Sequence, residues 1–184
     1  MKERVFNIYK PILFISLGTL ILIFNDVCYS YLNVTIGVVM ALFGLFHLLT
    51  VALHEGFIKH ISRLFYGIVL MIIAIVLIAT FNENLYGVAI VWSIWSILRE
   101  GKELGELFNE YKYTPVKIIS GLESVVVIVL AVMLMINPTE HHIIFHIYIL
   151  GIELLLEIIF PFLDKLFSEK ANNNKKESNN KHNK

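Results

Sequence analysis

The chain has 184 residues, of which 57% are hydrophobic and only 16% are charged, and its mean hydropathy is +0.73. Soluble globular domains carry about 25% charged residues, so this composition excludes an ordinary water-soluble domain and favours an integral membrane protein. The fifteen basic and fifteen acidic residues cancel, and no bulk charge indicates a nucleic-acid partner.

Six apolar stretches follow one another along the chain. They cover approximately residues 11–24, 31–53, 64–81, 85–98, 116–136 and 143–163. Most approach the ~20 residues that a helix needs to cross a bilayer core, and they lack the alternating pattern of barrel strands. Because every backbone polar group inside hydrocarbon needs an internal partner, the stretches predict six transmembrane helices in an all-α integral membrane fold.

The stretch at 85–98 is short for a membrane span. As a helix it covers only about 21 Å, which is less than the thickness of the bilayer core. We therefore expect the helix to continue through Arg99 and Lys102, whose long side chains can reach the interface. Residues 103–113 then place apolar side chains at helical spacing among charged ones, which predicts an amphipathic extension at the membrane surface.

Lysine and arginine occupy every second boundary between the apolar stretches. All fifteen lie before the first stretch, between the second and third, between the fourth and fifth, or after the sixth. The turns at 25–26, 82–84 and 137–140 contain none. Since positive charge in short loops marks the cytoplasmic side, both termini are predicted to be cytoplasmic.

The predicted spans form three tandem helical hairpins within one transmembrane domain. The domain covers residues 1–167, with repeats at approximately 8–56, 61–107 and 116–163. Small residues at Gly44, Ser93 and Gly151 hold similar places in the second, fourth and sixth spans, which predicts close helix packing. Residues 168–184 are rich in asparagine and lysine, and their low apolar content predicts a disordered cytoplasmic tail.

The repeats contain a recurring short motif. A basic residue stands one turn before a glycine in Arg63-Leu-Phe-Tyr-Gly67 and Lys117-Ile-Ile-Ser-Gly121, and Asn137-Pro138 forms an outer turn. With three membrane hairpins over residues 8–163, the chain resembles the HdeD-type acid-resistance proteins, small six-helix membrane proteins of bacteria and archaea without a defined biochemical function. The resemblance implies a prokaryotic inner-membrane location and a role in acid or envelope stress, and it supplies no catalytic residues.

Ionisable residues inside the spans are the candidates for chemistry, because each costs about 2.5–3.5 kcal/mol on insertion. The candidate intramembrane polar cluster consists of Glu123, Glu153, Glu157, Arg99, Arg63 and Lys117. Glu153 and Glu157 share one helix face. Arg99 holds the place in its repeat that Glu157 holds in the last one, which suggests that these two residues pair.

This cluster has two interpretations. In the structural one, the carboxyl groups are neutral or paired with the basic residues and hold the hairpins in register. In the functional one, Glu123, Glu153 and Glu157 take up protons beside Arg99 in a cavity that faces the cytoplasm. The outer halves of the spans offer few polar groups that would complete a pathway, so the structural interpretation is preferred.

Three histidines, His141, His142 and His146, gather at the outer end of the last span. Histidine titrates between about pH 5 and 8, which makes outward-facing imidazoles candidate pH sensors. His142 and His146 share a helix face, and a bound transition metal is the weaker alternative. Cys28 is the only cysteine, which excludes an intramolecular disulfide.

No sequence motif indicates an enzyme: a phosphate-binding loop, a nucleophile elbow and a His-Glu-x-x-His motif are all missing. The sequence therefore predicts a non-enzymatic HdeD-like membrane protein without a cofactor, metal or nucleic-acid partner. Its expected partners are membrane lipids, other membrane proteins or further copies of itself. The alternative is a small transporter or channel subunit that uses the carboxylate cluster, and a membrane enzyme acting on lipids is a third class.

Overall fold

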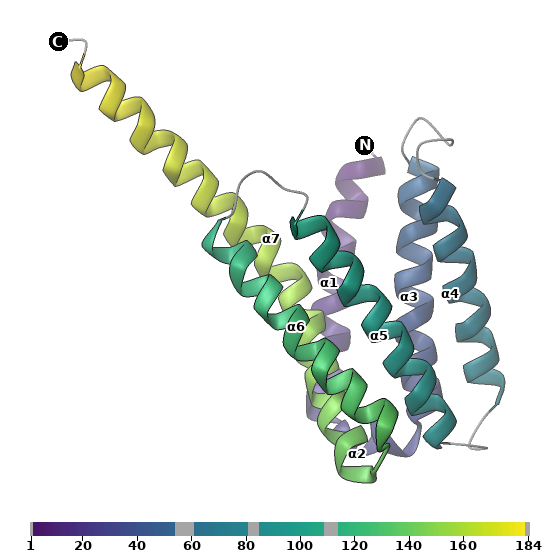
Figure 1. Ribbon diagram of the computed structural model, residues 1–184. Coiled ribbons are helices and arrows are strands. Elements are labelled where there is room, and N and C mark those ends of the chain that lie inside the picture. The colour runs from purple at the N-terminus through teal and green to yellow at the C-terminus, as the bar shows by residue number, and fades with distance from the viewer. Residues whose placement is uncertain (1, 54–60, 81–84, 109–113, 183–184) are drawn as a thin grey trace.

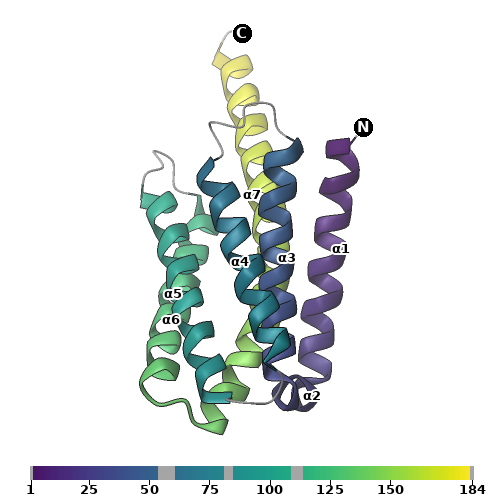
Figure 2. The same ribbon diagram turned by 90° about the vertical axis from the view of Figure 1, so that its right-hand side faces the viewer.

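The computed structural model describes residues 2–53, 61–80, 85–108 and 114–182. The regular elements of these residues are helices: α1 (Lys2–Ile23), α2 (Asn25–Ser30), α3 (Leu32–Leu53), α4 (Ile61–Ala79), α5 (Leu85–Phe108), α6 (Pro115–Ile136) and α7 (Glu140–His182). The long helices form a bundle (Figure 1), and the short α2 lies at the end opposite both termini (Figure 2). The predicted all-α fold is confirmed.

Hydropathy and length make this chain a multi-pass membrane protein. Four helices are long and apolar enough to cross a membrane, namely α3, α4, α6 and the part of α7 from Glu140 to Phe167. The apolar part of α1, Tyr9–Ile23, is shorter, and α5 carries several charged residues in its second half. Length and hydropathy thus account for four spans among the described helices, and six spans stay a prediction.

Local signals explain where the helices begin and end. The Thr114 side chain caps α6 by accepting the backbone N–H of Lys117 at 3.3 Å, and Pro115 occupies the first turn, where its missing N–H costs nothing. Pro138 follows the end of α6 because it cannot continue a helix. The expected extension of α5 past the apolar stretch is present as far as Phe108.

The most extensive helix pairings join consecutive repeats. α3 packs on α4, α5 packs on α6, and α7 packs on α1. In each predicted repeat the two long helices run antiparallel, but each of them packs most extensively on a helix of another repeat. The pairing of α7 with α1 joins the last repeat to the first.

Glycines make two of these pairings close. Gly44 on α3 faces Gly67 on α4, and a Cβ atom added to either would lie 2.9 Å from the other's carbonyl oxygen. Gly18 on α1 faces Gly151 on α7, where a Cβ atom on Gly18 would lie 2.8 Å from the Gly151 carbonyl oxygen. The predicted role of Gly44 and Gly151 in close helix packing is confirmed.

The apolar core fills the bundle from the α2 end to its middle. Its fully buried large side chains include Phe14, Ile21, Leu32, Ile36, Met40, Trp92, Leu134, Ile143, Ile147 and Leu150. Many of them come from the first turns of α3 and α7 and from the last turns of α1 and α6. The α2 end of the bundle is therefore closed mainly by packed hydrocarbon, with Asn25 and Asn33 buried in it, and the buried ionised groups gather towards the other end.

The last helix is longer than the sequence predicts. α7 continues past the bundle as far as His182 (Figure 1), through most of the segment 168–184 that was expected to be disordered. Lysine and glutamate in this segment are good helix formers, and extending an existing helix avoids the cost of nucleation. Low apolar content predicts the lack of a packed core, and a helix that projects from the bundle meets that condition as well as a coil does.

Candidate functional site

A buried ionic cluster joins α5 to α7. The guanidinium of Arg99 donates through Nε to Glu100 Oε1 at 2.6 Å, and its Nη2 forms ion pairs with both Glu100 and Glu153. The side chains of Glu100, Glu153 and Arg99 are 1%, 7% and 12% exposed. Hydrogen bonds between ionised partners are about twice as strong as neutral ones, so this cluster fixes how α5 and α7 face each other.

Aromatic rings surround the guanidinium. Arg99 lies over the rings of Phe43 on α3 and Trp95 on α5, with centroid distances of 5.5 and 5.1 Å. The indole N–H of Trp95 donates to the hydroxyl of Tyr66 on α4 at 3.2 Å. Cations gain energy from such ring faces, most of all where water is excluded. Arg99 thus connects α3, α5 and α7, and Trp95 extends the connection to α4.

Two contacts fix the register of α5 against α7. The rings of Trp92 and His146 meet edge to face with their centroids 5.4 Å apart, and Arg99 pairs with Glu153. Each contact lies seven residues from the other on both helices, which is two helical turns. The two helices run in the same direction, from the α2 end towards the end with the termini (Figure 1). We call this facing pair of helix surfaces the α5–α7 seam.

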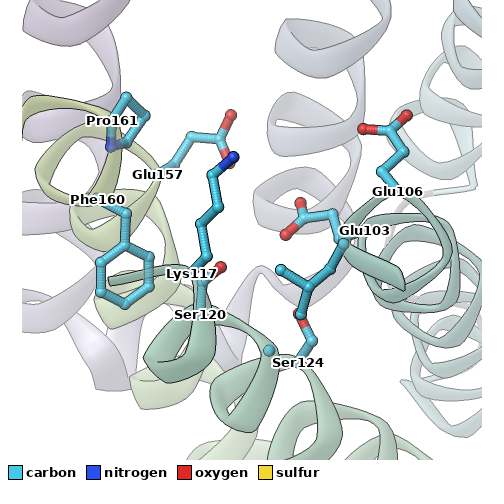
Figure 3. A pocket seen from close by; sticks show the side chains of 10 residues that line it. Glu103, Glu106, Lys117, Ser120, Ser124, Glu157, Phe160 and Pro161 are labelled. Atoms are coloured by element: carbon cyan, nitrogen blue, oxygen red, sulfur yellow. The ribbon is translucent and has the colours of Figure 1, made fainter. Parts of the chain in front are cut away.

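Beyond the cluster, two cavities widen towards the end of the bundle with the termini. One, of about 380 Å³, lies among α5, α6 and α7, and the other, of about 200 Å³, reaches Arg99. Glu103, Glu106 and Glu157 line both cavities, so together they form one polar vestibule. Figure 3 shows the side chain of Lys117 extending towards Glu157, with Glu103 across the cavity.

Further polar contacts line the vestibule. Lys10 on α1 forms an ion pair with Glu157 at 3.2 Å, and both side chains are about one-third exposed. Thr114, before α6, donates to Asp164 on α7 at 2.6 Å. These bonds join the first and last helices, and the start of α6 to α7, at the level where the bundle opens.

The structure brings together part of the predicted polar cluster. Arg99 and Glu153 meet directly, whereas Glu157 pairs with Lys10 and lies one turn nearer the opening. Lys117 lines the vestibule with Glu157. Glu123 is half-buried on α6 and lies within electrostatic range of the cluster, whereas Arg63 is exposed on α4, where none of the described carboxylates pairs with it.

Sequence reasoning missed Glu100 and Lys10. The sequence predicted that the charged end of α5 lies at the membrane interface with its long side chains reaching towards water, whereas Glu100 is buried. A signal for Glu100 was available: Ala89, Ser93, Ser96 and Glu100 follow the alternating spacing of four and three residues that marks one face of a packed helix. A seam of that kind turns charges inwards.

The three candidate pH-sensing histidines lie in different surroundings. His141 is exposed, and Nδ1 of His142 is 2.8 Å from the carbonyl oxygen of Asn137. His146 is 4% exposed and packs on Trp92. Over the described ranges, no group of three or more His, Cys, Asp or Glu side chains is placed to hold a metal ion.

Comparison of the chain with protein-family models, with curated proteins and with solved structures found no match. What the site can do therefore follows from its own chemistry. It holds one buried cation between two buried acids, beneath a vestibule that contains both signs of charge. Such a site can brace helices against one another and can exchange protons or small ions with the compartment at that end.

Proposed function

We propose that this protein is a non-enzymatic protein of a prokaryotic inner membrane with six transmembrane helices and both termini in the cytoplasm. The observation that carries the proposal is the burial of Arg99 and Glu100. Charged groups on a span face the interior of the bundle and pair there. α5 meets this requirement at its two innermost charges, because Arg99 and Glu100 pair with each other and Arg99 also pairs with Glu153 on α7. Its charged residues therefore do not prevent it from spanning the membrane.

The role that we propose is tolerance of acid or envelope stress, as in the HdeD-type proteins that the sequence resembles. A bundle braced by a buried ionic cluster is suited to a passive, structural part in the membrane. Lipids, other membrane proteins or further copies of the chain would be its partners, because the outward faces of α4 and α6 are apolar.

The stress role is tested by deleting the gene in its host and measuring survival after acid exposure and after neutral incubation. We expect acid survival to fall and to return with the wild-type chain. Arg99→Gln should fail to restore it because the cluster loses its only cation. Gly101→Ala is the matched control in α5, since an added Cβ atom there meets nothing within 4 Å. Equal acid survival with and without the gene would refute this role.

The vestibule supports a second candidate, a small transporter or channel subunit. Its charged walls open towards the proposed cytoplasmic end, and packed apolar side chains close the other end. The test is proton or solute flux in proteoliposomes that contain the wild type or variants with Glu123→Gln, Glu153→Gln or Glu157→Gln. A transporter predicts flux that the variants reduce, and flux that all three leave unchanged would exclude this function.

A further inference from the structure

We infer that Arg99, Glu100 and Glu153 form a proton-binding site, in which one proton is shared by the two glutamates. The inference starts from charge. Two carboxylates and one guanidinium give the fully ionised cluster a net charge of −1, and all three groups are buried. An uncompensated charge in the interior is costly, and two acids that share one environment do not both ionise easily. One bound proton makes the cluster neutral.

A second observation concerns the other carboxylate oxygen of Glu100, Oε2. Oε1 of this residue accepts from Arg99, but Oε2 is buried and has no hydrogen-bond partner among the described residues. A buried carboxylate oxygen without a donor is among the costliest polar groups, and the cost falls when the carboxyl is neutral. Glu100 and Glu153 therefore differ in surroundings but compete for the same guanidinium, and the proton belongs to the pair.

The neighbouring helices do not supply the missing positive charge. The titratable and charged groups of the helices around the cluster are Glu103 and Lys102 on α5, Glu123 and Lys117 on α6, Glu157 on α7, Tyr66 and Arg63 on α4, His47 on α3 and Lys10 on α1. Arg63 is exposed, and Lys117 lines the vestibule with Glu157. Lys10 is paired with Glu157, and Lys102 with Glu106. Glu103 and Glu123 are further acids and bring no positive charge, so the cluster is left with two carboxyl groups for one guanidinium.

The site opens on one side. Arg99 lines the cavity of about 200 Å³ that it shares with Glu103 and Glu157, which gives a polar route to the vestibule. In the other direction the seam is closed by Trp92 and Leu150, which are 2% and 1% exposed. The proton therefore exchanges with the compartment at the end with the termini. A metal cation is disfavoured, because hard cations need several oxygen ligands and the described residues offer no such set.

Infrared spectroscopy of the protein in lipid membranes tests the inference, because a protonated carboxyl has its own C=O stretching band. Spectra are compared in a background with Glu103→Gln and Glu123→Gln, which removes two other half-buried carboxyls beside the cluster. At neutral pH we expect a buried carboxyl band that Glu153→Gln and Glu100→Gln each abolish, since each variant leaves Arg99 with one ionised partner. Glu140→Gln, at the exposed start of α7 and outside both cavities, is the matched control and should retain the band.

A band that survives both cluster substitutions, or that Glu140→Gln removes, overturns the inference. If a cluster variant does not fold, the background chain alone still decides. Raising the pH from neutral to strongly alkaline must convert a protonated carboxyl to carboxylate, and a spectrum without that change refutes the site. This result does not depend on the stress role, because the band is measured on purified protein whatever the survival phenotype.

Discussion

At the scale of single residues, Arg99 decides whether α5 can lie inside a membrane. A lone guanidinium in hydrocarbon would be expensive, but here two carboxylates and two aromatic rings surround it. The same burial makes the cluster sensitive to the loss of any one member. Removing one partner of a buried pair is far more harmful than replacing both partners.

Arg99→Gln should therefore be strongly destabilising. It leaves Glu100 and Glu153 buried without a cation, and the expected loss in the free energy of unfolding is about 3–5 kcal/mol at neutral pH. The loss should shrink as the pH falls, because protonation removes the uncompensated charges. Thermal unfolding of the purified protein in detergent, followed by circular dichroism over a range of pH, measures both effects.

Lys102→Gln is the control for this substitution. Lys102 also pairs with a glutamate, Glu106, at 3.7 Å, but the two side chains are 52% and 67% exposed. Exposed helix pairs contribute about 0.3–0.5 kcal/mol, so this variant should unfold close to the wild-type temperature. If the two variants proved equally stable, the cluster would not brace α5 against α7.

The sequence predicts several charged residues of this site but not which of them pair, because pairing depends on the relative height of two helices. The cost of charge in a span singles out Arg99, Glu153 and Glu157 from the sequence alone. The sequence does not say which acid meets the arginine, because α5 and α7 belong to different repeats and their relative height is set by tertiary packing. Repeat equivalence suggested Glu157, whereas the contact of Trp92 with His146 sets a height at which Glu153 is the partner.

At the scale of helices, two of the three junctions between repeats share one device. Gly44 with Gly67, and Gly151 with Gly18, bring helix backbones into contact. The third junction differs, because Gly121 on α6 lies under the Leu107 side chain of α5. Hydropathy predicts where these helices lie along the chain. It does not reveal that their closest neighbours come from the adjacent repeat, because short connections are compatible with either choice.

Gly44→Ala should separate packing from helix propensity. Alanine is the better helix former by about 1 kcal/mol, but its Cβ atom would lie 2.9 Å from a backbone oxygen that cannot turn away. Overpacking of this kind typically costs about 1–3 kcal/mol, so we expect lower stability in thermal unfolding. Gly101→Ala gains the same propensity with open space around it, and should match or exceed the wild type. Equal behaviour of the two variants would contradict a close α3–α4 crossing.

At the scale of the whole molecule, the ionic cluster and the apolar core lie towards opposite ends of the bundle. The termini, the vestibule and the ionic cluster lie towards one end, and α2 with the apolar core closes the other (Figure 2). The distribution of lysine and arginine predicted this polarity before the helices were placed. It also predicts that the end with the termini meets the cytoplasm, which labelling from each side of the membrane tests.

The native Cys28 offers a direct test of orientation. It is half-buried on α2, at the end opposite the termini, and a membrane-impermeant maleimide should reach it from outside in right-side-out vesicles. Burial raises the pKa of the Cys28 thiol, and this effect is larger than the lowering by the hydrogen bond with Thr35. Because the thiolate is the reactive form, labelling should be slow at neutral pH and should quicken about tenfold per pH unit below the pKa.

Two variants in a Cys28→Ala background separate orientation from reactivity. Thr139→Cys lies in the exposed turn between α6 and α7, at the same end as α2, and should be labelled from outside without the penalty of burial. Lys165→Cys lies on α7 towards the end with the termini and should react only in inverted vesicles. If Lys165→Cys were labelled from outside and Thr139→Cys were protected, the predicted topology would be wrong and the orientation would be the reverse. The proton site would then face the exterior, although the cluster itself would be unchanged.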